Sequence, residues 1–445
     1  MNSYLGYIIL GIFCILIFIR YINNKEITSI TISYCIISPS VQFIGMKLDS
    51  SYFLLVYICM LVILFKKDLR VNKNIKSYFL LTIFICFIYY IAWMFNSGKD
   101  VLVMLISLAG ILKVGVFMVI LYSLDCEKLQ NNNYIFIKII SIVTILNLLA
   151  ILYQVFFPSE AYNIFSELYS SNTANYYKQD TSLWGKGGFY NGRYTRYFGL
   201  FENPMSLACY SLIAISYVIT KISSRLINKK LCTILLIILL YIGFMSTTKT
   251  FILGIVLLFI FLAVLQMADK SNKKIKLLTI TLIMLAFILT IVFYSEIYNL
   301  LFEYNPSLAY YFSYLKDPVS AFNTRFGSLN GDGSLSYVFK IMNENPLIGV
   351  GPTSVNGEIV GDNAYVVLIH NGGLIALVTI VGYYMRHLFN SFRFRDTTTT
   401  LLILTTLIVS MGMPILTGGN LTLFIIYYLC IEKNISNRYG SIKMI

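Results

Sequence analysis

The sequence predicts an all-α polytopic membrane protein with about 12 to 13 transmembrane helices and two long extracytoplasmic loops. Its 445 residues are 58% hydrophobic and only 12% charged, and the mean hydropathy is +0.76. One soluble core cannot hide so much apolar side chain, so a lipid bilayer must solvate it. A hydrocarbon layer about 30 Å thick requires about 17 to 25 mostly apolar residues per helix. About thirteen runs of that kind follow one another along the chain.

The predicted spans fall into three groups. The N-terminal group, within residues 1–157, contains 4–22, 28–46, 51–65, 77–95, 101–123 and 134–157; the central group, within 199–294, contains 199–220, 231–246, 249–267 and 277–294; the C-terminal group, within 363–445, contains 363–385, 399–416 and 419–431. Pro39 interrupts the second run and the third run is short, so these two are candidates for one broken hairpin. The first run follows no basic residue and ends in no small-residue cleavage site. We therefore expect it to stay as an anchor and not to be removed as a signal peptide.

Lysine and arginine are concentrated in every second loop. They are Lys66, Lys67, Arg70, Lys73 and Lys76, then Lys221, Arg225, Lys229 and Lys230, then Lys270, Lys273, Lys274 and Lys276, then Arg386, Arg393 and Arg395, and in the tail Lys433, Arg438 and Lys443. Short basic loops stay cytoplasmic. The pattern thus predicts a cytoplasmic C-terminus and places the long segments 158–198 and 295–362 outside. The same bias explains the net charge of +14 without a nucleic-acid partner.

Several function classes lack their motifs. Seven of the eight cysteines fall in predicted spans and Cys126 in a predicted cytoplasmic loop, so neither a disulfide framework nor a cysteine-based metal site is expected. Two histidines, His370 and His387, are too few for a zinc site. The chain has no phosphate-binding loop of the ATPase type. We therefore expect no metal and no cofactor.

The first long loop ends in "NGRYTRYFGLFENPMSLACY", which places Arg193, Arg196, Glu202 and Asn203 where a helix should begin. Guanidinium groups bind phosphate oxygens bidentately and tyrosine rings pack on sugars, so this stretch suits an anion that carries a sugar. The alternative is that Arg and Tyr anchor the helix at the headgroup level. Pro204 at a first helical position supports a helix start here.

The second long loop carries "FNTRFGSLNGDGSLSYVFKIMNENPLIGVGPTS". Residues 334–343 have apolar positions at helical spacing and predict a short surface helix. The following "PLIGVGP" predicts a glycine-rich turn, with phosphate binding as the weaker alternative. Arg325 is an isolated guanidinium ahead of that helix, whereas Asp332 in "GDG" is expected to be a turn residue.

The stretch "VGDNAYVVLIHNGG" places Asp362 where a membrane helix should begin. As a helix cap it would accept hydrogen bonds from the first free N–H groups. As a general base it would orient or deprotonate an acceptor hydroxyl. Asn363 and Tyr365 are candidate sugar contacts beside it.

Two lysines require separate explanations. Lys113 lies near the centre of the fifth run, where a charge costs roughly 2.5 to 3.5 kcal/mol and so needs a partner or an aqueous cavity. We consider Glu202 as one possible partner. Lys249, in "STTKTF", opens the ninth run at its outer boundary and either snorkels to the interface or binds an anion.

These stretches together resemble a known family. The ordered set "RYFGLFENPMSLA", "STTKTFILG", "TRFGSL", "NENPLIGVGPTS" and "DNAYVVLIHNGGLIALV" resembles the O-antigen and capsule polymerases of the Wzy type and their relatives, the O-antigen ligases. The resemblance covers roughly residues 193–384, and the earlier helices match only as generic membrane spans.

The resemblance implies a glycosyltransferase of the bacterial inner membrane that acts on its outer face, in lipopolysaccharide or capsule biosynthesis. Such enzymes move a glycan from undecaprenyl pyrophosphate onto the terminal sugar hydroxyl of another lipid-linked repeat. Besides these lipid-linked oligosaccharides and the bilayer, a chain-length regulator and a flippase are candidate partners. No nucleotide sugar and no metal are implied.

Carried over to this chain, the resemblance assigns Arg196 and Arg325 to the anionic donor, with Arg193 as an additional candidate. Lys249 stands where relatives often have Arg, which keeps the charge but loses the bidentate fork. Ligases commonly have His before the Asn that corresponds to Asn363, whereas this chain has Asp362, which favours a polymerase. The long arginine-to-glycine spacing described for some polymerases is not reproduced at the three arginines.

Two alternatives stay open. An O-antigen ligase would use lipid A core as its acceptor. A lipid-linked oligosaccharide flippase or other transporter would suit the many spans and the intramembrane Lys113, but would leave the two long loops unexplained.

Overall fold

The computed structural model describes residues 4–43, 46–65, 67–96, 101–129, 135–169, 189–190, 193–194, 196–222, 227–268, 292–313, 316–317, 319, 334–355, 358–359 and 363–433. These residues are mostly helical and their strands are short, which confirms the all-α polytopic class. Within these ranges six helices are long and apolar enough to cross a membrane: α1 (Tyr4–Ile22), α4 (Lys73–Asn96), α5 (Val101–Leu129), α6 (Ile135–Phe156), α9 (Pro204–Lys221) and α17 (Ala364–Arg393). Further helices complete the bundle: α2 (Thr28–Ile37), α3 (Ser51–Leu64), α10 (Lys229–Met245), α11 (Lys249–Ala268), α18 (Thr397–Val409), and α19 (Asn420–Tyr427), which continues as a π-helical turn, η1 (Tyr428–Glu432). The predicted run 277–294 lies almost wholly outside the described residues.

The second predicted span is helical only in its first half. Helix α2 ends at Ile37, and an antiparallel hairpin follows, formed by β1 (Ser40–Phe43) and β2 (Met46–Asp49) with Ser40 opposite Asp49. Pro39 cannot donate a helical hydrogen bond and disfavours helix at the residue before it, which explains the early end. An unbroken helix over 28–46 was the wrong expectation. The interruption at Pro39 is confirmed, and a β-hairpin that the sequence did not predict joins α2 to α3.

The remaining elements belong to the two long segments. The first segment contains α7 (Pro158–Leu168) and the two-residue strands β3 (Phe189–Tyr190) and β4 (Arg193–Tyr194). The second contains α13 (Tyr294–Tyr304), α14 (Pro306–Ser313), α16 (Ser334–Glu344), β5 (Ser354–Val355) and β6 (Glu358–Ile359). Helix α16 confirms the surface helix predicted at 334–343.

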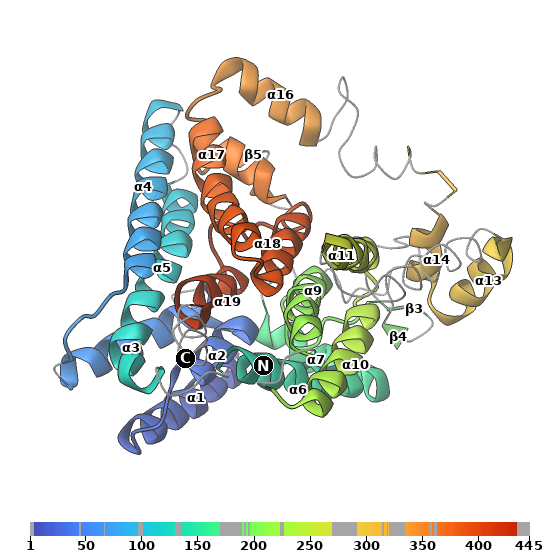
Figure 1. Cartoon of the computed structure of the whole chain (residues 1–445), viewed down its shortest axis with the longest axis horizontal. Coiled ribbons are helices and arrows are strands. Elements are labelled where there is room, and N and C mark those ends of the chain that lie inside the picture. The colour runs from blue at the N-terminus through green and yellow to red at the C-terminus, as the bar shows by residue number, and fades with distance from the viewer. Residues whose placement is uncertain are drawn as a thin grey trace.

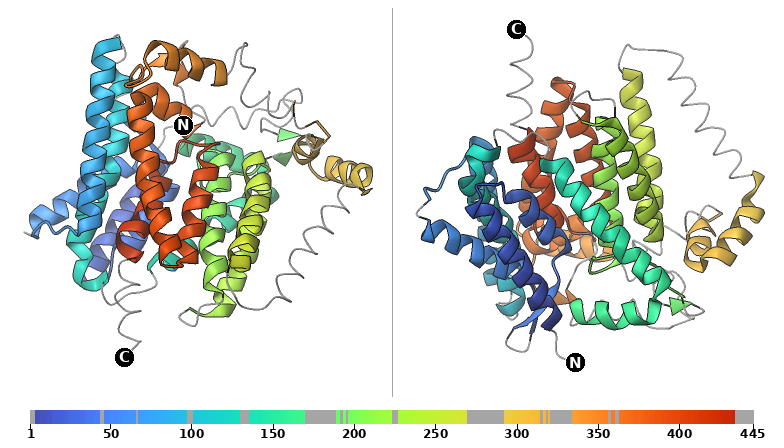
Figure 2. Two further views of the ribbon diagram at one scale, coloured as in Figure 1. Left: turned by 45° about the horizontal axis from the view of Figure 1, so that its top comes forward. Right: turned by 90° about the horizontal axis from the view of Figure 1, so that it is seen from below.

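The long helices stand side by side, and α7 lies across one end of them, the end at which α1 begins (Figure 2). We call this the α7 end. At the opposite end, which we call the basic end, Lys433 lies 3.6 Å from Asp396 and Arg70 lies 3.1 Å from Glu127. The amide of Asn72 joins the start of α4 to η1 there by donating to the Cys430 carbonyl (2.9 Å). Where the structure describes the basic loops, they thus lie at the end opposite α7, as the charge pattern predicts.

The centre of the bundle is packed by aromatic rings from α6, α9 and α19. Phe136 stacks on Phe424, with ring centroids 4.3 Å apart, and meets Tyr217 edge-on at 4.5 Å. Offset and edge-on contacts of this kind stabilise a core beyond the burial of apolar area. They hold α9, whose N-terminus carries much of the candidate site, against α6 and α19 (Figure 1).

Candidate functional site

Residues 196–203 fold over the α7 end as a plug anchored to α6. Their rings are buried, with Phe198 only 1% exposed. The Gly199 N–H donates to the Gln154 side chain (3.2 Å), and the Leu200 N–H donates to the Asn147 side chain (2.9 Å). Gly199 has φ +58°, and a Cβ there would lie 2.3 Å from Asn147 Oδ1, so only glycine fits. Helix α9 therefore starts at Pro204 and not at residue 199, where the hydropathy places it.

The starts of α9 and α11 meet beside this plug. Asn203 caps α9 by accepting a hydrogen bond from the Ser206 N–H (2.8 Å), which confirms the predicted helix start. The Thr250 hydroxyl, next to Lys249, donates to Met205 Sδ (2.9 Å). A Cβ on Gly412 would lie 2.7 Å from that hydroxyl, so the α18–α19 loop closes against the same place.

Helix α17 begins at the other side of the same loop. The Ala364 N–H donates to the Ser410 carbonyl (2.9 Å). Asn363 Oδ1 accepts from the Tyr365 and Val366 N–H groups (2.9 and 3.3 Å) and is the N-cap. We expected Asp362 to cap this helix, so that assignment is wrong; the side chain of Asp362 lies outside the described residues. The Tyr365 hydroxyl donates to the Leu407 carbonyl (2.7 Å) and ties α17 to α18.

Two of the predicted cations flank one turn. The N–H of Tyr197, which follows Arg196, donates to the Met245 carbonyl (3.0 Å) at the end of α10, and Lys249 starts α11 four residues later. Arg196 is partly buried, and the Lys249 ammonium lies 6.0 Å from the ring centre of Tyr310 in α14. The fold therefore brings Arg196 and Lys249 to the same α10–α11 turn.

That turn contains a backbone outlier that sequence reasoning missed. Thr247 has φ +45° and is 2% exposed. A β-branched residue at positive φ is a genuine outlier, and such strain tends to occur at functional sites. The sequence "STTKTF" gives no sign of it, because threonine is not a residue that normally marks this conformation.

The other predicted site residues are less fully placed. Glu202 is exposed, and it lies close enough to Tyr169, after α7, to raise the pKa of that phenol beyond the increase that burial causes. The backbone of Arg193 pairs with Tyr190 in the β3–β4 hairpin. Arg325 lies outside the described residues.

Lys113 has a complete set of partners away from this site. Its ammonium lies 2.9 Å from each of Asp49 Oδ2, Ser51 Oγ and Asn420 Oδ1, and 4.5 Å from the ring centre of Tyr52. The expectation that a buried lysine needs a partner is confirmed. The suggested partner Glu202 was wrong. The partner is Asp49 at the end of β2, and a hydropathy pattern does not predict the hairpin that places it there.

The glycine-rich stretch after α16 packs into a break in α17. Helix α17 breaks at Gly372 and Gly373, whose φ values are −150° and +61°. The loop 346–351 fills the break: the Val350 N–H donates to the His370 carbonyl (2.7 Å), and the Leu374 N–H donates to the Pro346 carbonyl (2.9 Å). The predicted turn is confirmed, and the amides of Val350 and Gly351 are engaged by His370 rather than free for a phosphate.

His370 itself joins three segments at this break. Its Nδ1 lies 2.7 Å from the Tyr337 hydroxyl of α16, and its Nε2 lies 3.3 Å from the Thr353 hydroxyl. Burial, together with the nearby Glu344 carboxylate, raises the pKa of Tyr337 to about 12, so the phenol keeps its proton at neutral pH. The only sequence signal was a histidine within an apolar run.

Helix N-termini carry partial positive charge, so the starts of α9, α11 and α17, with Arg196 and Lys249, form a region suited to an anion. Among the described residues no group of three or more His, Cys, Asp or Glu is placed to hold a metal ion.

No family model matches the chain, and no curated protein is significantly similar to it. The function must therefore be inferred from the residues themselves.

Proposed function

We propose that this protein is a polysaccharide polymerase of the bacterial inner membrane. It transfers a glycan from undecaprenyl pyrophosphate to the terminal sugar hydroxyl of another lipid-linked repeat, on the extracytoplasmic side. The observation that carries the proposal is the meeting of Arg196 and Lys249 at the α10–α11 turn, among the starts of α9, α11 and α17. A departing pyrophosphate needs such a concentration of positive charge.

The proposed chemistry assigns roles to Asp362, to Lys249 and to the three predicted arginines. The acceptor oxygen attacks the anomeric carbon of the donor, and the bond from that carbon to the pyrophosphate oxygen breaks. Asp362 takes the hydroxyl proton as general base. Arg196 and Lys249, with Arg193 and Arg325 from the two long segments, balance the charge on the released polyprenyl pyrophosphate.

The proposal places the prenyl tail along α11, beside this turn. Leu253, Val256 and Ile260 recur at helical spacing along α11, starting one turn beyond Lys249, and are 59%, 52% and 40% exposed. An exposed apolar stripe on a membrane helix faces lipid, so a polyprenyl chain can lie along it with its pyrophosphate at Lys249.

The test is the glycan ladder of a strain that lacks this gene, complemented with wild type, Arg196→Lys, Asp362→Ala or Lys76→Ala. Lys76 is exposed at the basic end and serves as the matched control. We expect wild type and Lys76→Ala to restore the ladder. Arg196→Lys should lower chain growth at least about tenfold despite the kept charge, because a bidentate contact is lost, and Asp362→Ala should leave a single repeat.

The pattern of failure separates the alternatives. A fully active Arg196→Lys variant would remove the pyrophosphate role of Arg196. Accumulation of long lipid-linked polymer without surface attachment in the deletion strain would indicate an O-antigen ligase. Accumulation of single repeats on the cytoplasmic side would indicate a flippase.

A further inference from the structure

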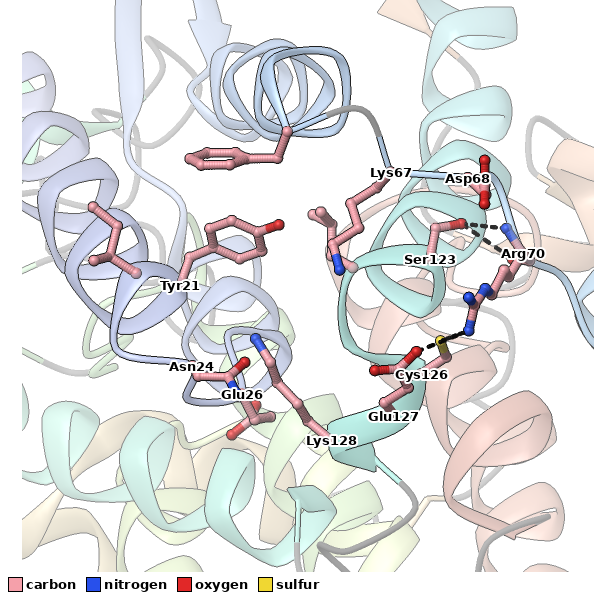
Figure 3. Close-up of a pocket in the computed structure, with 13 residues that line it drawn as sticks. Tyr21, Asn24, Glu26, Lys67, Asp68, Arg70, Ser123, Cys126, Glu127 and Lys128 are labelled. Atoms are coloured by element: carbon pink, nitrogen blue, oxygen red, sulfur yellow. Dashed lines mark hydrogen bonds and ion pairs between the residues drawn. The ribbon is translucent and has the colours of Figure 1, made fainter.

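A cavity of about 960 Å³ opens at the basic end, between the C-terminal ends of α1, α3 and α5 (Figure 3). It lies at the end of the bundle opposite to α7, and the proposed polymerisation makes no use of it. Its charged lining consists of three bases, Lys67, Arg70 and Lys128, and three acids, Glu26, Asp68 and Glu127. The lining is therefore polar but formally neutral.

The three basic side chains of the cavity differ in the partners that they contact. Arg70 lies 3.1 Å from Glu127, and Lys128 lies 3.6 Å from Asp125 and 5.0 Å from the ring centre of Tyr21. Within the described ranges, Lys67 forms no ion pair. Figure 3 shows the side chains of Lys67, Lys128 and Tyr21 extending into the cavity, with Glu127 beside Arg70 on the α5 side. Two ammonium groups and a hydroxyl are donors suited to a phosphate.

The side of the cavity that carries Glu127 suits a positively charged group of a ligand. Glu127 is 76% exposed, and the adjoining ends of three helices carry the partial negative charge of their carbonyl groups. A ligand that carried only negative charge would meet this repulsion. A ligand with a phosphate and an ammonium, a few atoms apart, would satisfy both sides.

Apolar residues beside the cavity indicate that the ligand comes from the bilayer. Ile22 and Phe65 line it and are 60% and 43% exposed, and Ile19, Ile63 and Leu64 next to them are 48%, 73% and 72% exposed. Exposed apolar side chains at the end of a membrane helix contact acyl chains. The cavity thus lies where a headgroup would be found while its tails remain in the leaflet.

We propose that this cavity is a binding site for a zwitterionic phospholipid of the phosphatidylethanolamine type. Lys67 and Lys128 hold the phosphate with the Tyr21 hydroxyl, and Glu127 holds the ammonium. The aromatic pair of Tyr21 and Phe65, whose ring centres are 4.8 Å apart, forms the wall on the acyl side.

The test measures lipid retention by native mass spectrometry on the full-length protein, delipidated in detergent and supplied with phosphatidylethanolamine, phosphatidylglycerol or water-soluble phosphoethanolamine. We expect phosphatidylethanolamine to be retained in preference to phosphatidylglycerol. Lys67→Ala should lower retention about fivefold, the effect of one lysine near a headgroup. Lys76→Ala, which removes an exposed lysine of the same end outside the cavity, should change nothing.

The Glu127→Gln variant tests the contact to the ammonium group separately from the contacts to the phosphate. It should weaken phosphatidylethanolamine and leave phosphatidylglycerol unchanged, because only the former has an ammonium. Equal or better retention of phosphatidylglycerol by the wild type would overturn the zwitterionic assignment. Equal losses in Lys67→Ala and Lys76→Ala would overturn the site, and retention of phosphoethanolamine without any preference among lipids would overturn the bilayer source.

Discussion

At the scale of single residues, buried polar groups decide where the chain is fixed. Asp125 of α5 is fully buried and accepts hydrogen bonds from the Ile27 and Thr28 N–H groups (2.8 and 2.9 Å), so it caps α2 from another helix. Asn147 and Gln154 of α6 hold the plug of residues 196–203 in the same way. Each buried N–H group would cost free energy without such a partner.

The ion pair of Lys113 and Asp49 should stabilise the protein mainly because each charged group neutralises the other. Lys113→Met leaves the Asp49 carboxylate beside a nonpolar side chain, and we expect the free energy of unfolding to fall by about 3 to 5 kcal/mol. Thermal unfolding in detergent measures this. In the double variant Lys113→Met, Asp49→Asn, much of the loss should be recovered; two losses that simply add would contradict the coupling.

Asn147 is expected to act on polymerisation by positioning the plug. Asn147→Leu removes the acceptor of the Leu200 N–H, so Arg196 loses its fixed place, and we predict shorter glycan chains at normal protein level. Asn96→Leu is a control, because it removes a hydrogen bond to the Gly349 carbonyl (2.9 Å) far from the α10–α11 turn. Equal chain length in wild type and Asn147→Leu would exclude the positioning role.

At the scale of elements, α17 consists of two helical parts, and the loop 346–351 forms hydrogen bonds to both of them at the break. The break exists because the loop 346–351 supplies hydrogen-bond partners that a continuous helix would supply itself. The break thus fixes the second long segment onto the α7 end of the bundle, directly before β5, β6 and the start of α17.

Two glycines of α17 should respond oppositely to alanine. At Gly373, φ is +61° and a Cβ would lie 2.3 Å from the Leu347 carbonyl oxygen, so Gly373→Ala should destabilise the protein by about 2 kcal/mol or more. At Gly382 nothing lies within 4 Å, so Gly382→Ala should stabilise by up to about 1 kcal/mol. Unfolding midpoints of the two variants test this, and a neutral Gly373→Ala would contradict the docked loop.

At the scale of the whole molecule, the two ends of the bundle differ in chemistry. The α7 end gathers helix starts and the residues proposed to polymerise glycans. The basic end gathers lysine and arginine residues, which the charge pattern predicts to lie on the cytoplasmic side. The two proposals therefore place glycan transfer at one membrane face and lipid recognition at the other.

The orientation can be tested with introduced cysteines and a membrane-impermeant maleimide. Ser159→Cys, on the exposed surface of α7, should be labelled on intact spheroplasts. Lys73→Cys, exposed at the start of α4, should be labelled only after permeabilisation. The reverse order would invert the topology, and with it the face proposed for polymerisation.

Composition and hydropathy by themselves determined the membrane class and the approximate spans. Local residue patterns determined the helix start at Pro204 and the surface helix α16, because these depend on residues close together in the chain. The residues 193–384 also supplied the candidate arginines and lysines. Only the tertiary structure decided which residues meet. Lys113 and Asp49 are separated by 64 positions, and Asn96 and Gly349 by 253. The strained Thr247, the break in α17 and the cavity at the basic end all depend on such distant contacts, whose hydrogen bonds and packing no local pattern encodes.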